Sequence, residues 1–130
     1  MVRRVTVDAG VLTAVAKGCP MARAHFEVFR RHNVEVVIPA PAIAQSMTGR
    51  TLRDARVNLA IRGCKVVDTT EPIARRAAVL QDRADLPNAT VQAMVVATSE
   101  LVGGRALLTD GESDEINTLA SQSSVRVETR

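Results

Sequence analysis

Apolar and polar residues follow one another along this chain in short blocks that predict strands and helices in alternation. Strands are predicted where β-branched and aliphatic residues form runs of about four or five between polar or turn-forming residues. Helices are predicted where apolar residues recur every three or four positions and the pattern stops at a glycine. The expected strands are Arg4–Val7, Val34–Ile38, Cys64–Val67, Arg105–Thr109 and Val125–Glu128.

Seven helices are expected between these strands. Phe26 and Phe29 are expected to face inward, together with Met21 and Val28. Glycine or proline punctuates most of the helix ends, which is the usual chemistry of helix boundaries. The predicted helices cover residues 9–17, a segment from 20, 42–47, 51–62, a segment from 71, a segment from 87–88 that ends at 103–104, and 114–120.

This alternation predicts a single α/β domain over residues 1–130, with a central, mostly parallel five-stranded sheet between two helical layers. In such folds the binding site lies beyond the carboxyl ends of the strands, where the strand order reverses. The chain shows no repeat and no linker, so one compact domain accounts for its length.

Composition removes some classes of function. Phe26 and Phe29 are the only aromatic residues, so a surface that binds single strands by stacking bases on rings is excluded. The net charge is +3, and every basic residue except Lys17 and Lys65 is an arginine. This balance is compatible with nucleic acid, with an acidic protein partner, and equally with ordinary solubility.

The remaining composition signals concern location. The two cysteines, Cys19 and Cys64, match no metal-binding spacing and are expected to be reduced thiols. No apolar run is long enough to span a bilayer, and the N-terminal stretch is interrupted by Asp8. The expectation is a cytoplasmic protein with no membrane segment.

Two predicted strands end in a carboxylate, and this is the main chemical signal. Asp8 follows the first strand and Asp110 follows the fourth, with Glu112 and Asp114 within a turn of Asp110. If the two strands are neighbours, the acids converge and favour a hard cation such as Mg²⁺ or Mn²⁺. Taken one at a time, each acid is better explained as a helix cap, and it is their shared position at two strand ends that favours a cation site.

Three blocks, VTVDAGVLTAVAKG, VIPAPAIAQSMTG and QAMVVATSELVGGRALLTDGESDEI, resemble the PIN-domain nucleases, most closely the VapC-type toxins of toxin–antitoxin pairs. The resemblance implies a three-layer PIN-like fold and a quartet of acids that binds Mg²⁺ or Mn²⁺ and cuts single-stranded RNA. By resemblance the first acid is Asp8 and the fourth is Asp110, supported by Asp114 or Glu112.

The other two quartet positions are occupied here by Gln45 and Gln92. A glutamine carbonyl can contact a hard cation, but it carries no charge. The quartet is therefore degenerate, and the expected nuclease activity is weak or lost. Alternatively, Gln45 and Gln92 form a neutral hydrogen-bonded network with the acids, in a non-catalytic module that binds RNA or a protein partner in a regulatory role.

Partners follow from charge and from the resemblance. Arg50, Arg53 and Arg56 recur at three-residue spacing and are candidates to follow an RNA backbone, although a solvated helix face explains them as well. The VapC-type resemblance implies a homodimer and an antitoxin-like partner whose C-terminal segment lies over the acidic crevice.

Overall fold

A computed structural model describes residues 3–111 and 114–129. Within these residues the chain alternates strands and helices as the sequence predicts. The strands are β1 (Arg4–Val7), β2 (Glu35–Pro39), β3 (Lys65–Val67), β4 (Ala106–Thr109) and β5 (Arg126–Thr129). The helices are α1 (Ala9–Ala16), α2 (Pro20–Arg31), α3 (Ala40–Ser46), α4 (Thr51–Ile61), α5 (Glu71–Ala84), α6 (Thr90–Leu101) and α7 (Asp114–Ala120).

The five strands form one sheet in the order β3-β2-β1-β4-β5, and every adjacent pair is parallel. The strand order reverses at β1, which lies between β2 and β4. Val7 of β1 is level with Leu108 of β4, so these two strands end side by side. The predicted neighbours are confirmed, and the residues that follow β1 and β4 meet at the switch point.

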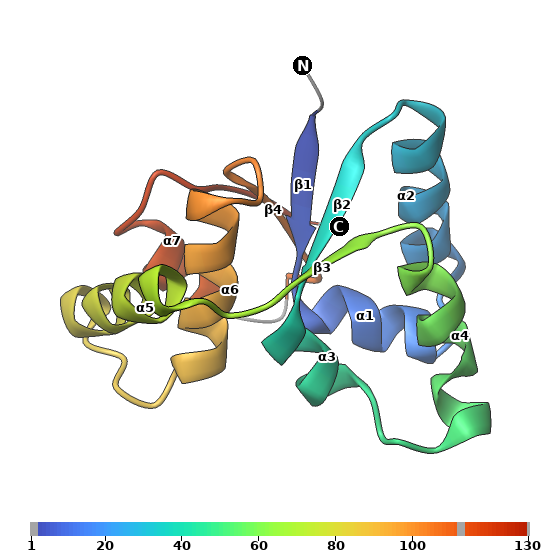
Figure 1. Cartoon of the computed structure of the whole chain (residues 1–130), viewed down its shortest axis with the longest axis horizontal. Helices are drawn as coiled ribbons and strands as arrows, with labels where there is room; N and C mark the ends of the chain where they lie inside the picture. The colour runs from blue at the N-terminus through green and yellow to red at the C-terminus, as the bar shows by residue number, and fades with distance from the viewer. Residues whose placement is uncertain (1–2, 112–113, 130) are drawn as a thin grey trace.

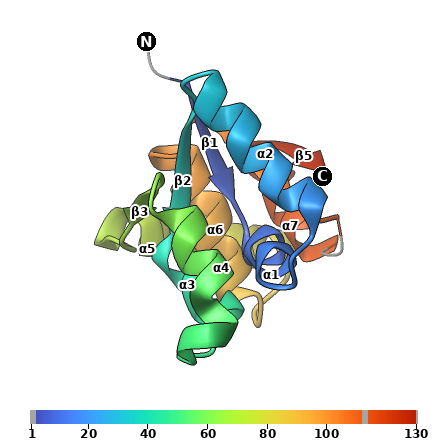
Figure 2. The same cartoon turned by 90° about the vertical axis from the view of Figure 1, so that its right-hand side faces the viewer.

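Helices cover both faces of the sheet and produce three layers. Helices α5, α6 and α7 pack together on one side, and α1 contacts α2, α3 and α4 on the other (Figure 1). The view from the side shows α2 and α4 in front of the sheet, with α1 beside them (Figure 2). The three-layer α/β class predicted from the sequence is confirmed. No helix of the described residues is long and apolar enough to cross a membrane.

The core is packed mainly from small aliphatic side chains. Leu12, Ile38 and Leu107 are fully buried, and Phe26 is 9% exposed while Phe29 is partly buried against the core. The expectation for Met21 and Val28 was wrong, because they are 62% and 48% exposed. Helix α2 contacts the core through a narrow stripe formed by Ala22, Phe26 and the partly buried Phe29, so Met21 and Val28 lie on its exposed side.

Helix α4 also turns an unexpected face to the core. Leu52 and Leu59, whose spacing predicts the helix, are 93% and 62% exposed, whereas Val57 and Asp54 are buried. The Asp54 carboxylate accepts hydrogen bonds from the backbone N–H groups of Thr48 and Gly49, at 2.9 and 2.6 Å. A satisfied polar side chain thus takes an inward position, and this rotates the leucines outward.

Candidate active site

The first acid lies at the carboxyl end of the central strand. Asp8 follows β1 directly, is 5% exposed, and caps α1 by accepting a hydrogen bond from the Val11 N–H at 3.0 Å. Its other carboxylate oxygen accepts a hydrogen bond from the Thr109 hydroxyl of β4 at 2.6 Å. Both the capping role and the strand-end position predicted for Asp8 are therefore present together.

Burial raises the pKa of Asp8 above its ordinary value, because the charged form loses its hydration. The hydrogen bonds from Thr109 and Val11 oppose this rise, and the nearby charge of Asp110 adds to it. The carboxyl group is thus held in an environment that disfavours its ionised form.

Asp110 lies close to Asp8, on the other side of Gly10. A Cβ built on Gly10 would lie 3.1 Å from Cβ of Asp110 and 3.3 Å from Oδ1 of Asp8, so the two acids flank this residue. The absence of a side chain at position 10 therefore keeps the space between the acids open.

Both glutamines line the same cavity as the acids. A cavity of about 80 Å³ is lined by Asp8, Gln45, Gln92 and Asp110, which come from the ends of β1 and β4 and from α3 and α6. The pattern found in the sequence therefore assembles in space. Within the described residues neither carboxamide makes a hydrogen bond, so the neutral network suggested from the sequence is absent.

The rest of the cavity is formed by residues that carry no charge. Ala9, Val95 and Ile116 supply apolar walls, and Thr109 supplies a hydroxyl. The sequence offers little to single these out, because aliphatic residues in α6 and α7 serve the core in the same way. Thr109 has a weak signal in its position as the last residue of β4, directly before Asp110.

The donor set fits a divalent cation poorly. Among residues 3–111 and 114–129 no group of three or more histidine, cysteine, aspartate or glutamate side chains could hold a metal ion. Asp114 is the exposed first residue of α7 and does not line the cavity, and Glu112 lies outside the described residues. Two carboxylates, one of them already bonded to Thr109 and Val11, remain for the cation.

The three predicted RNA-binding arginines lie outside this cavity. Arg50 precedes α4, and Arg53 and Arg56 are on it. Arg56 has a structural contact, since its Nη1 donates a hydrogen bond to the carbonyl oxygen of Ala16 at 3.1 Å. This bond satisfies a carbonyl at the C-terminal end of α1, which the helix itself leaves unpaired.

An all-parallel sheet with helices on both faces and an acid-bearing cavity at the switch point is the three-layer α/β architecture, with the cavity at the position where such folds bind ligands. No family model matches the sequence, and no curated protein is significantly similar to it. The fold is similar to a chain in the crystal structure of VapBC2 from Rickettsia felis bound to a DNA fragment from their promoter. The TM-score is 0.72 at 9% identity, and the match covers 97% of this chain and 98% of that chain.

Proposed function

We propose that this chain is a PIN-like protein of the VapC type in which Mg²⁺- or Mn²⁺-dependent RNA cleavage is weak or lost. The observation that carries the proposal is the lining of the 80 Å³ cavity, where two carboxylates face two carboxamides. In the family that the sequence resembles, four acids occupy these positions. Asp8 and Asp110 are the candidate catalytic and metal-binding residues in this lining, and Asp114, the third candidate that the resemblance implies, lies outside it.

The electrostatics of the cavity support a weakened metal site. A metal ligand must be deprotonated, and burial already disfavours the ionised form of Asp8. Replacing two further carboxylates by neutral amides removes half of the negative charge that would offset a divalent cation. The chemistry that the metal supplies in this family, activation of a water molecule, is weakened in step with metal binding.

Restoring the acids tests the proposal. The variant Gln45→Glu/Gln92→Asp is compared with the native chain for Mn²⁺ binding by calorimetry and for cleavage of a labelled single-stranded RNA. We expect the variant to bind Mn²⁺ at least 100-fold more tightly than the native chain and to cleave RNA, and both gains to disappear when Asp8→Ala is added. Equal cleavage by the native chain and the variant would refute the proposal.

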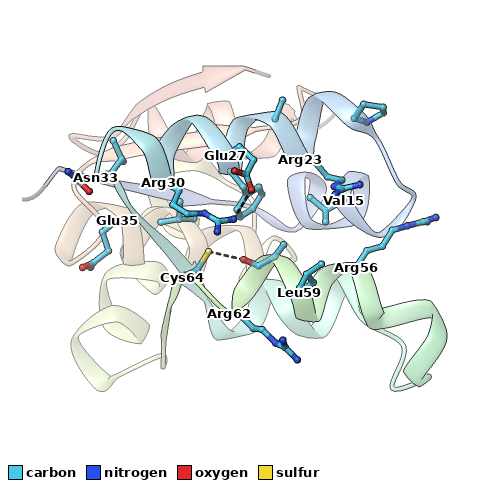
Figure 3. Close-up of a pocket in the computed structure, with 17 residues that line it drawn as sticks. Val15, Arg23, Glu27, Arg30, Asn33, Glu35, Arg56, Leu59, Arg62 and Cys64 are labelled. Atoms are coloured by element: carbon cyan, nitrogen blue, oxygen red, sulfur yellow. Dashed lines mark hydrogen bonds and ion pairs between the residues drawn. The ribbon is translucent and has the colours of Figure 1, made fainter.

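A groove elsewhere on the molecule favours a second candidate function, the binding of a protein partner. The groove has a volume of about 980 Å³ and lies between α2 and α4, with Phe26, Val15 and Leu59 among its lining residues. Figure 3 shows Arg23 on the α2 side and Arg56 on the α4 side at one end of it. An apolar floor beside arginines suits an amphipathic, acidic helical segment of an antitoxin-like protein.

This second function is tested with a synthetic amphipathic helix of leucine and glutamate residues. We expect Arg23→Glu and Leu59→Asp each to weaken its binding at least tenfold, whereas Val79→Asp, at an exposed site on α5, leaves binding unchanged. Equal losses in all three variants would contradict a role for the groove. The homodimer implied by the resemblance is tested by sedimentation equilibrium, which should give twice the chain mass of 13.9 kDa.

A further inference from the structure

Arginines gather at the edge of the sheet opposite the acid cavity. Because all strands are parallel, their amino ends share this edge. Arg3 and Arg4 stand at the start of β1, Arg105 directly precedes β4, and Arg126 begins β5. These three strands are adjacent, and all four side chains, here called the amino-edge arginines, are exposed. The pairing of Thr6 with Leu107 makes Arg4 level with Arg105.

Two of these arginines have an acidic partner. Nε of Arg4 lies 3.0 Å from Glu35, and Nη2 of Arg126 lies 3.2 Å from Glu128. Both pairs are solvent-exposed, so they are weak and easily exchanged for another anion. Within the described residues Arg3 and Arg105 have no hydrogen-bonded or ionic side-chain partner. The amino-edge arginines therefore carry an excess of positive charge.

The backbone of Arg105 is in a conformation that disfavours its own side chain. Its φ is +61°, in the left-handed region, where glycine, asparagine and aspartate are the usual residues. Its N–H donates to the Ser99 carbonyl at 2.9 Å, and its carbonyl accepts from the Arg126 N–H at 2.8 Å. A glycine would make both bonds without the steric cost of a Cβ. The fold therefore does not explain why an arginine occupies this position.

We infer that the amino-edge arginines are a binding surface for the phosphate backbone of single-stranded RNA. Guanidinium groups match phosphate oxygens with paired hydrogen bonds, and the backbones of the adjacent strands that carry these arginines lie about 4.8 Å apart. Leu101, the last residue of α6, and Val102, its C-cap, are 47% and 39% exposed and offer an apolar surface for base faces in a chain without tyrosine or tryptophan.

This surface is separate from the acid cavity. The four residues of β1 span about 13 Å between the two edges of the sheet. RNA bound here needs neither the acids nor a metal ion. The inference therefore stands whether or not the cavity cleaves RNA, and its test is made in EDTA so that the two questions remain distinct.

The test measures binding of a labelled 20-nucleotide single-stranded RNA to the full chain by fluorescence anisotropy, between 50 and 200 mM salt. We expect Arg105→Gly to weaken binding at 50 mM salt about three- to tenfold, and to lower the slope of log K against log salt by about 0.7. The melting temperature should stay equal or rise, because glycine relieves the strain at this position.

Two control variants and one competitor make the result decisive. Arg83→Ala removes an exposed arginine from α5, and Asn33→Gly changes another residue with positive φ; both should leave RNA binding unchanged. The inference is overturned if Arg105→Gly lowers the melting temperature and leaves binding intact, which would indicate a structural role. It is also overturned if Arg83→Ala weakens binding equally, if polyglutamate displaces RNA as well as unlabelled RNA does, or if no RNA binds at 50 mM salt.

Discussion

Acids at positions 45 and 92 should make the stability of this protein depend on metal ions, whereas the melting temperature of the native chain should be independent of them. In Gln45→Glu/Gln92→Asp, four carboxylates line a cavity of about 80 Å³, which corresponds to a sphere about 5 Å across. Without a cation these groups repel one another, and the variant unfolds more easily than the native chain. A bound divalent cation attracts the four carboxylates, so it stabilises the folded state of the variant.

The size of the cavity sets how strongly the carboxylates repel one another, and therefore how much stability the variant loses. Two unit charges about 5 Å apart interact by about 3 kcal/mol at an effective dielectric constant of 20. Protonation of the added groups relieves part of this, so we expect the variant to lose roughly 2–4 kcal/mol in EDTA. For a domain of this length the loss corresponds to a fall in melting temperature of roughly 10 °C. A cation at 100 times its dissociation constant restores about 2.7 kcal/mol.

Thermal unfolding followed by circular dichroism, in EDTA and in 1 mM Mn²⁺, measures both effects. The native chain should melt at the same temperature in the two buffers, and the variant should melt lower in EDTA and recover in Mn²⁺. Adding Asp110→Asn to the variant should reduce the recovery. If Mn²⁺ stabilises the native chain as much as it stabilises the variant, the glutamines do not weaken the site and the reasoning fails.

Three further predictions concern the rest of the molecule. Glu100→Gln should lower the unfolding free energy, measured by chemical unfolding, by about 1.5–3 kcal/mol, because the Glu100 side chain is 11% exposed and lies 2.6 Å from Arg76. The control Glu71→Gln should lower it by less than about 0.5 kcal/mol, because both side chains of the Glu71–Arg75 pair are 77% exposed. Asp8→Asn should stabilise the fold at pH 7 and lose that advantage on acidification below the ordinary aspartate range. The raised pKa of Asp8 means that the folded state binds its proton more tightly than the unfolded state, so only the ionised form is costly; unfolding midpoints at pH 3 and pH 7 give the comparison. Gly103→Ala should lower the unfolding free energy by about 2–3 kcal/mol, because its Cβ would lie 2.8 Å from Cα of Ser99.

The arrangement of strands and helices could be predicted from the sequence because local signals agree with the global fold. Asp8 caps α1, Pro20 begins α2, and Gly18 and Gly104 adopt the positive φ values that end the preceding helices. The sequence predicts that helix α6 starts at residues 87–88. In the structure the helix starts at Thr90, and its N-cap is Ala89. Asn88 therefore belongs to the turn before the helix.

The side of α4 that faces the core could not be predicted from the apolar pattern. Leu52 and Leu59 have the correct spacing for a buried stripe, but the burial of Asp54 depends on the backbone of residues 48–49, which no periodicity encodes. The same limit applies to the groove between α2 and α4. Its existence follows from exposed apolar residues on two helices that only the tertiary structure places beside each other.

The residues that line the acid cavity could be predicted from the sequence, but the hydrogen bonds between them could not. Strand ends and the family pattern predict that Asp8, Gln45, Gln92 and Asp110 share one place, and they do line one cavity. That Thr109 holds Asp8 through a 2.6 Å hydrogen bond depends on the register between β1 and β4. Asp114 has the right spacing in sequence, yet α7 carries it to an exposed position away from the cavity lining.

The neutral side chains of Gln45 and Gln92 also affect how this molecule would meet RNA. A cavity with four ionised carboxylates repels phosphate unless a cation neutralises it, so binding and metal loading are coupled. Gln45 and Gln92 add no charge to the cavity, whose described lining carries the carboxylates of Asp8 and Asp110, so this repulsion is smaller than with four carboxylates. The amino-edge arginines are unaffected by the change, since they lie at the opposite ends of the same strands. A cavity with less negative charge and a basic edge at the opposite ends of the strands therefore favour RNA binding without metal, in line with the proposed weakening or loss of cleavage.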